Sequence, residues 1–331
     1  MKELLEDKRE IWEIFTRQDE YKELELIKKG RFPYYLSEYR DILNPKVSEF
    51  LYKNGFKISF PDKYEFGVCL THDVDNLRYP FNRHIEDFIS HKSIFRFLKN
   101  PYKNLKKIID IEKKIGAKSS FYLLANSSRY KIDEFKNDFL YIVDEGWEVG
   151  LHGGYTTFNN IEMMIKEKKI LEKNLNKEII GYRNHYLLFK IPDTWELLSK
   201  AGFKYDTTYG YPDMVGFRNG MCHPFKPFNL STSKEINILE IPLTVVDGAL
   251  FNYMHLDIKE SWNFCKKIID TVKKVKGVVT ILWHNHAFSG NADRKEWEKL
   301  YYKILTYCYE EKAWITSGEE IYKWWKEQRV R

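Results

Sequence analysis

The sequence contains few cysteines, and no two of them have metal-binding spacing. The four, Cys69, Cys222, Cys265 and Cys308, are scattered over 331 residues and form no Cys-x-x-Cys pair. A thiolate zinc site is therefore not expected, and a disulfide framework has no support in a chain of this size. Free thiols of this kind fit a reducing compartment.

We also expect no targeting signal and no membrane span, and the net charge is weak. The first eight residues are charged throughout, no window approaches a membrane span, and no repeat or low-complexity region is visible. The formal net charge of +6 is spread along the chain. It is compatible with an anionic substrate or a membrane surface, but it is too weak to indicate nucleic acid. We expect a cytoplasmic protein that does not bind nucleic acid and does not require a membrane.

The chain does contain a regular alternation of strand-like and helix-like segments, beginning near residue 66. Apolar residues make up 43% of the sequence, enough for a full core. We expect strands at 66–71, 119–125, 148–153, 179–185, 204–209, 238–246, 278–284 and 313–316. We expect helices at 104–115, 136–145, 160–176, 192–201, 258–275, 295–311 and 319–328.

This alternation is typical of a parallel sheet covered by helices. There are seven or eight units, and neither G-x-G-x-x-G nor G-x-x-x-x-G-K occurs, which favours a closed barrel over an open nucleotide-binding sheet. The predicted fold class is α/β, a distorted seven- or eight-stranded (β/α) barrel over residues 61–331. Residues 1–60 are predicted to form a helical extension, a packing or partner-binding cap without chemistry of its own.

Polar side chains gather at the predicted strand ends, where barrels of this class place their active sites. The first strand ends in Thr71-His72-Asp73-Val74-Asp75. Asp73 and Asp75 are one residue apart, so both point to the same side, and burying two acids is costly unless a metal or a proton transfer needs them. Later strand ends carry His152, Arg183, His185, Asp206, Asp247, His284 and His286.

These motifs and their order resemble the polysaccharide deacetylase superfamily (NodB homology, carbohydrate esterase family 4) over residues 66–320. The stretches that carry the resemblance are 71–75, 148–152, 183–186, 216–225 and the strand end at His284. More narrowly, the chain resembles an uncharacterised D-x-D branch associated with bacterial surface polysaccharides. Three positions depart from the usual pattern: Val74 separates the acids, Thr156 stands where a second histidine is usual, and His185 replaces a proline.

The resemblance implies a role for each of these residues. Asp73 would be the general base and Asp75 and His152 ligands of one divalent metal ion, most simply zinc. Arg183 would pair with Asp73, and His284 would donate a proton to the leaving amine, with Asp247 orienting it. His185 is our preferred third ligand, with His72, Asp206 and His286 as alternatives. Substrate contacts are expected from Tyr186, Arg218, His223 and His286.

Two loops beside the predicted site could contact the substrate. The segment 76–107 is long, basic and aromatic, so it could bind a sugar, a diphosphate or a membrane interface, or be an ordinary helical insertion. The segment 210–228 is rich in glycine and proline and carries Arg218 and His223.

The function that the resemblance implies is a metal-dependent N-deacetylase. Its substrate would be an acetamido sugar of surface-glycan biosynthesis, nucleotide- or lipid-linked. Two alternatives stay open. One is a hydrolase that opens a cyclic amide or imide with the same metal site. The other is a degenerate protein that binds a glycan or a partner without catalysis.

Overall fold

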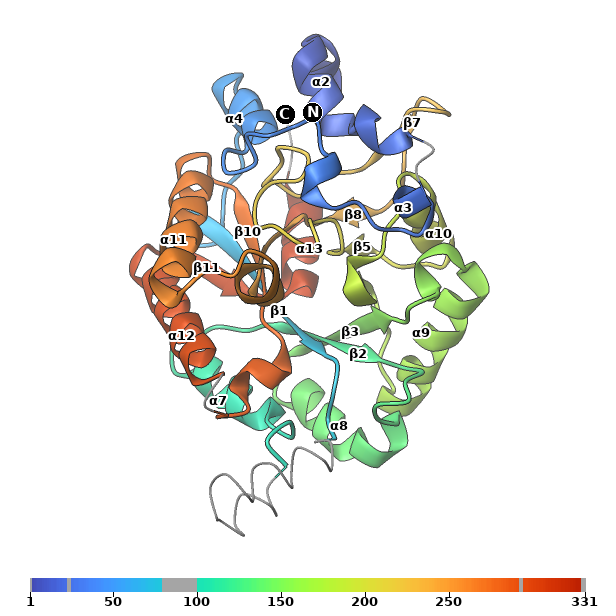
Figure 1. Cartoon of the computed structure of the whole chain (residues 1–331), viewed down its shortest axis with the longest axis vertical. Coiled ribbons are helices and arrows are strands. Elements are labelled where there is room, and N and C mark those ends of the chain that lie inside the picture. Colours follow the sequence, from blue (N-terminus) through green and yellow to red (C-terminus); the bar gives the residue numbers. More distant parts are fainter. Residues whose placement is uncertain (1, 23–24, 79–99, 292–293, 329–331) are drawn as a thin grey trace.

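The computed structural model describes residues 2–22, 25–78, 100–291 and 294–328 (Figure 1). Within them a nine-stranded sheet lies at the centre of the molecule, with helices around it. Its strands are β1 (Phe66–Val74), β2 (Ser120–Leu124), β3 (Glu148–Gly153), β4 (Gly181–Asn184), β5 (Tyr205–Asp206), β8 (Leu239–Glu240), β9 (Leu243–Val246), β10 (Val278–Leu282) and β11 (Ala313–Thr316). A separate hairpin pairs β6 (Phe228–Asn229) with β7 (Lys234–Glu235).

The helices around the sheet begin and end within two residues of the predicted ranges. They are α7 (Leu105–Lys113), α8 (Lys136–Asp144), α9 (Ile161–Leu175), α10 (Asp193–Lys200), α11 (Ile258–Lys274), α12 (Lys295–Glu310) and α13 (Gly318–Glu327). Short turns η3 (Ile132–Phe135), η4 (Thr157–Asn159), η5 (His185–Leu187), η6 (Ala249–Tyr253) and η7 (Asn285–Phe288) follow or precede them. Polar caps fix several starts: Asp257 and Glu260 form a capping box at α11, and Ser317 caps α13.

The strands pair in the order β8-β5-β4-β3-β2-β1-β10-β9, and β11 pairs with the first half of β1. Every ladder in this sheet is parallel, so the prediction of an α/β barrel is confirmed. The hydrogen-bonded ring is not closed, however, and the strand expected at 238–246 is two strands. Pro242 lies between β8 and β9 and has no N–H to donate, so the chain breaks there and passes from one edge of the sheet to the other.

The longest strand, β1, is buried along all nine of its residues. Both faces of a parallel barrel strand are covered, which explains why its sequence is continuously apolar before the polar end. Its side chains alternate: Thr71 and Asp73 face the barrel interior, where both contact Arg183. His72 faces outward, toward Glu112 of α7 and Tyr301 of α12.

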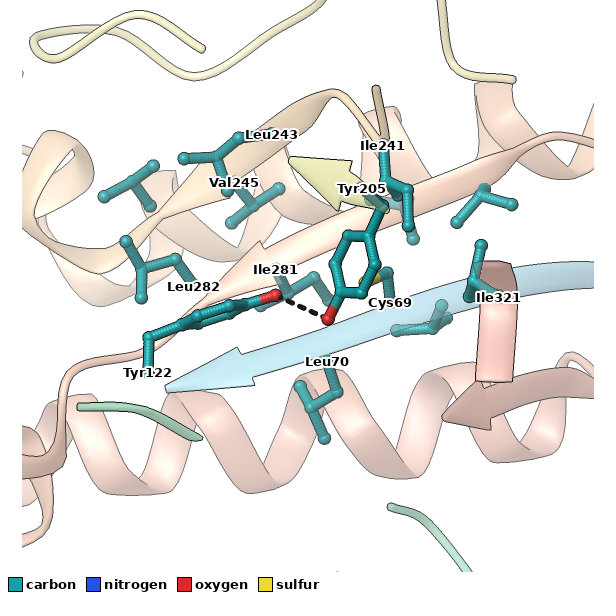
Figure 2. Close-up of a cluster of buried hydrophobic side chains, with 14 of the residues drawn as sticks. Cys69, Leu70, Tyr122, Tyr205, Ile241, Leu243, Val245, Ile281, Leu282 and Ile321 are labelled. Carbon is teal, nitrogen blue, oxygen red and sulfur yellow. Dashed lines mark hydrogen bonds between the residues drawn. The ribbon is translucent and has the colours of Figure 1, made fainter. Parts of the chain in front are cut away.

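The barrel interior is filled by apolar and aromatic side chains from several strands (Figure 2). Tyr122 and Tyr205 meet across it, with their hydroxyl oxygens 3.1 Å apart. Tyr205 donates its own proton to Glu148, so Tyr122 must be the donor between the two tyrosines. The ring of Tyr205 lies against Gly181, where a Cβ atom would stand 2.2 Å from the tyrosine hydroxyl. Only glycine fits at this position without moving the ring.

The N-terminal segment consists of short elements joined by irregular chain. These are α1 (Lys2–Glu6), α2 (Arg9–Thr16), η1 (Gln18–Tyr21), α3 (Glu25–Lys28), η2 (Tyr34–Leu36) and α4 (Lys46–Lys53). Leu5, Phe15 and Leu51 belong to the same hydrophobic core as the barrel strands. A buried ionic network adds to this contact, because Glu20 accepts hydrogen bonds from Arg218 and lies 3.4 Å from the Arg17 guanidinium. The segment is therefore packed firmly against the barrel.

Across the described ranges, no helix combines the length and the apolar character that a membrane span requires. Most of the basic, aromatic segment expected at 76–107 lies outside these ranges, because residues 79–99 are not described.

Candidate active site

A cavity of about 200 Å³ opens at the carboxyl ends of the central strands. Its walls include Asp73 and Asp75 after β1, His185 and Tyr186 in η5, and His284 and His286 after β10. A larger hollow of about 430 Å³ lies on the N-terminal segment, but its charged side chains include pairs such as Arg17 with Asp19 and it touches no strand end. The smaller cavity is the one that the strand-end rule for barrels predicts.

Asp75, His152 and His185 converge beside the cavity. Asp75 Oδ1 lies 3.3 Å from His152 Nε2 and 3.3 Å from His185 Nδ1, and the two histidine nitrogens are 3.1 Å apart. One ligand atom from each residue falls within 4.8 Å of the others. Oδ1 is buried and has no hydrogen-bond donor among the described residues. A buried carboxylate oxygen left open between two imidazoles is what a divalent cation would satisfy.

The hydrogen bonds and the electrostatics of the three residues suit metal binding. His152 Nδ1 lies 3.0 Å from the carbonyl oxygen of Arg183 and must donate to it, so Nε2 is the nitrogen that faces Asp75. Burial lowers the pKa of His185, which favours the neutral ligand form. Burial alone would raise the pKa of Asp75, but its contacts with His152 and His185 and the positive charge of His284 hold that pKa well below its ordinary value.

Asp73 is buried beside this cluster and is paired with Arg183. Arg183 Nη1 lies 3.4 Å from Asp73 Oδ1, and its other nitrogens donate to Thr207 Oγ1 at 2.8 Å and Thr71 Oγ1 at 3.0 Å. The β3–β4 register places Arg183 beside His152, which lies 3.6 Å from Asp73 Oδ2. The guanidinium is thus fixed by two hydroxyl groups while it neutralises the acid.

His284, which follows β10, is bound to Asp247. The imidazole Nδ1 lies 2.6 Å from Asp247 Oδ1, and its Nε2 lies 3.9 Å from Asp75 Oδ2. Burial alone would lower the pKa of His284, but the charge and hydrogen bond of Asp247, with smaller contributions from Asp75 and Asp73, raise it to about 10. These acids therefore favour the protonated form of His284, and its Nε2 lies on the side of Asp75.

Tyr186 and His286, two of the expected substrate contacts, also line this cavity. Tyr186 is 48% exposed, and its ring lies against that of His185 with centroids 4.0 Å apart. Its backbone has a φ of 57°, and Leu187 follows with a φ of 52°. Left-handed conformations are costly for such residues, and they are found most often where a site needs a side chain in one orientation.

The structure does not bring the other two expected substrate contacts to the cavity, and both predictions need correction. Arg218 is buried, and its guanidinium binds Glu20 and the carbonyl oxygen of Gly210. His223 is buried at the opposite end of the barrel, where its Nε2 lies 3.2 Å from the carbonyl oxygen of Val275 and its ring packs on Phe56. Neither side chain has a face left for a substrate.

The alternative third ligands lie outside the cluster. His72 points to the far face of β1, where Nε2 lies 2.7 Å from Glu112 and Nδ1 lies 2.7 Å from the carbonyl oxygen of Trp283. Asp206 is buried and accepts from the hydroxyl and N–H groups of Thr208. His286 stands next to His284, with ring centroids 5.2 Å apart. His185 is therefore the third residue of the arrangement.

Sequence reasoning missed several residues of the cavity wall. Asn252 and Tyr253 belong to η6, directly after the strand end at Asp247, so the strand-end rule could have found them. Arg129, which follows β2, does not line the cavity itself but lies 3.8 Å from Asp75 and donates to the Tyr186 hydroxyl. Arg31 comes from the N-terminal segment, and no local pattern in the sequence marks it.

Comparison with known proteins gives a likeness of structure. No family model matches the chain, and no curated protein matches its sequence. Among solved structures, a protein of Mycobacterium smegmatis described as a polysaccharide deacetylase is 15% identical, with a TM-score of 0.60 over 84% of this chain and 96% of its own. The Puue allantoinase is 15% identical, with a TM-score of 0.58 over 85% of this chain and 98% of its own.

A third structure, from Pseudomonas aeruginosa PAO1 and also described as a polysaccharide deacetylase, is 13% identical. Its TM-score is 0.57, over 82% of this chain and 94% of its own. At such identities the likeness is one of fold, and it agrees with the resemblance carried by the strand-end motifs. The chain has the fold of the polysaccharide deacetylases.

Proposed function

We propose that the protein is a metal-dependent hydrolase that removes an N-acetyl group from an acetamido sugar. The observation that carries the proposal is the convergence of Asp75, His152 and His185 within 4.8 Å, between the buried pair of Asp73 with Arg183 and the pair of His284 with Asp247. Amide hydrolysis needs an activated water, a polarised carbonyl group and a proton for the leaving amine. The cavity offers a group for each task.

Asp75 Oδ1, His152 Nε2 and one nitrogen of His185 would hold a divalent cation, for which zinc is our candidate. Nitrogen and carboxylate donors in a set of three, with one side open to a cavity, suit a catalytic zinc ion. The chemistry that such an ion supplies when bound is Lewis-acid polarisation of a carbonyl group and activation of water. The hydrogen bond from His152 Nδ1 to the carbonyl oxygen of Arg183 orients the imidazole for this role.

Asp73 would take the proton from the attacking water. Its carboxylate lies on the cavity wall and is held by the Arg183 guanidinium, which fixes its direction. The two threonines that bind Arg183 leave that side chain no freedom to turn away. Arg183 therefore acts on the reaction through Asp73.

His284 would give its Nε2 proton to the leaving amine. Asp247 accepts from Nδ1, so the proton that faces the cavity is the one on Nε2. A positive imidazolium on the wall also favours negative charge developing on the substrate during attack. In this scheme Asp73 takes the proton of the attacking water and His284 supplies the proton of the departing amine.

For the substrate we propose an acetamido sugar of surface-glycan biosynthesis, linked to a nucleotide or a lipid. Exposed tyrosines at the cavity support a sugar: Tyr186 and Tyr253 line it, and each is 48% exposed. The likeness of fold to an allantoinase is compatible with a second candidate, the opening of a cyclic amide. A binding protein without catalysis is the third.

The test is acetate release from a panel of N-acetylated sugars, free and nucleotide-linked, by the zinc-loaded wild-type chain and by Asp73→Asn. We expect release by the wild type and none by the variant, with the metal content of the two proteins equal. Ring opening of cyclic amides without acetate release would favour the second candidate. Acetate release at the wild-type rate by Asp73→Asn would remove the role of Asp73.

A further inference from the structure

The N-terminal segment contributes one arginine to the wall of the catalytic cavity. Arg31 lines it together with Tyr253, Asp73 and Asp75. Its guanidinium donates to the Tyr253 hydroxyl at 3.2 Å and lies 5.9 Å from the centre of that ring. A residue more than thirty positions before the first barrel strand thus lines the same cavity as the proposed catalytic groups.

The backbone around Arg31 is fixed against the loop that carries His185. The carbonyl oxygen of Gly30 accepts from the N–H of Phe189, two residues after η5, at 2.7 Å. Gly30 has a φ of 75°, and a Cβ atom there would stand 2.6 Å from the ring of Phe158. The N–H of Arg31 donates to the carbonyl oxygen of Leu26 at 2.8 Å. The backbone at Arg31 is therefore held in place by hydrogen bonds to the rest of the fold.

Arg31 differs from the other arginines near the cavity in its partners. Arg183 is paired with Asp73, and Arg129 lies near Asp75. Among the described residues no carboxylate pairs with Arg31, and the Tyr253 hydroxyl accepts from one of its five N–H donors. A guanidinium at a cavity wall that still has most of its N–H donors to offer suits bidentate binding of an oxyanion.

We propose that Arg31 and Tyr253 form an anion subsite, and that the substrate carries a phosphate or carboxylate group close to its acetamido group. The Arg31 guanidinium binds the anionic oxygens, and the Tyr253 hydroxyl holds the guanidinium in position. This inference rests on the proposed function, since it names the class of sugar that the catalytic groups act on. It also assigns a purpose to the N-terminal segment, which completes the substrate site.

Binding tests the subsite without relying on turnover. All proteins carry Asp73→Asn and are loaded with zinc, and the ligands are N-acetylglucosamine, its 1-phosphate, and N-acetylmuramic acid, which carries a carboxylate. Calorimetry should show that at least one anionic sugar binds about tenfold more tightly than the neutral one, because a charge-assisted hydrogen bond is worth about a factor of ten or more. The preferred anion identifies the group.

Arg31→Gln should remove the difference between the anionic and neutral sugars, and Arg31→Lys should keep part of it because the charge remains. The matched control is Arg9→Gln, which removes the same charge from a highly exposed arginine paired with Glu13, away from the cavity. No preference for either anionic sugar, or a preference that persists in Arg31→Gln, would overturn the subsite. Absence of acetate release by the wild type would instead count against the proposed function, whatever the binding preference.

Discussion

Asp247 binds His284 twice: one carboxylate oxygen lies 2.6 Å from the imidazole Nδ1, and the other accepts from the backbone N–H at 2.9 Å. The acid is fully buried at the end of β9, while His284 follows β10. The double contact fixes the histidine's main chain and its ring together. It also brings the negative charge of Asp247 next to His284, the side chain that we expect to protonate the leaving group.

Asp247→Asn should therefore move the alkaline limb of the pH–kcat profile to lower pH. Asp247 and nearby acids raise the pKa of His284 to about 10, so removing its charge should let that pKa fall toward the ordinary value near 6.5. The protonated acid is then lost at a lower pH. Profiles of kcat and an NMR titration of His284 would measure the shift. Asp270→Asn, on α11, is the control, and equal profiles for the two variants would refute the role of Asp247.

Metal content should depend on Asp75 and His185 together. Elemental analysis of protein purified without added metal should find about one divalent ion per wild-type chain and a large loss in Asp75→Ala and His185→Ala, since each variant removes one of three donors. His286→Ala is the matched control, because it removes a cavity histidine outside the cluster. Loss in Asp75→Ala with full retention in His185→Ala would show that another residue completes the set.

Arg183→Met should lower the free energy of unfolding of the metal-free protein by about 3–5 kcal/mol, because it leaves Asp73 buried without its cation. Adding Asp73→Asn to that variant should restore part of the loss, since the uncompensated charge is then gone. Chemical denaturation in the presence of a chelator measures both. Strictly additive effects of the two substitutions would mean that the pair is not coupled.

Glu20→Gln should destabilise the whole chain by a similar amount, about 3–5 kcal/mol, because Arg17 and Arg218 are both buried against this carboxylate. Glu10→Gln is the control: its side chain is well exposed and lies 3.9 Å from Lys46, so little change is expected. Denaturation followed by two probes, one near the cavity, would show whether the barrel responds. A loss confined to the N-terminal segment would contradict joint packing.

Most of the fold could be predicted because its signals are local. The run from Phe66 to Leu70 is apolar because β1 is covered on both faces, and the helices start at recognisable caps such as Ser317. The prediction of one strand at 238–246 was wrong, because the structure has two strands there. The sequence does contain the reason: Pro242 has no N–H to donate to a ladder. Side chains alternate between the two faces of β1, so the sequence could likewise have shown that His72 points away from the face that carries Asp73 and Asp75.

The candidate site was predictable as far as strand ends define it, which covers Asp75, His152, His185 and His284. The remaining errors depend on long-range partners. In the sequence Arg218 looks like a substrate contact, but in the structure it is bound to Glu20. Arg31 looks like an ordinary surface arginine, and only the hydrogen bond between Gly30 and Phe189 shows that its segment packs beside the site. No spacing or periodicity in the sequence links these pairs.

The pairing of Glu20 with Arg218 also sets an order of events during synthesis. The two residues are 198 positions apart, so a ribosome adding about 5–20 residues per second delivers the arginine roughly 10–40 s after the acid. Throughout that interval the helices of the N-terminal segment, with apolar side chains such as Leu5 and Phe15, lack the completed barrel on which they pack. This segment is then among the last parts of the structure to reach its place, and its apolar side chains stay accessible to chaperones until it does.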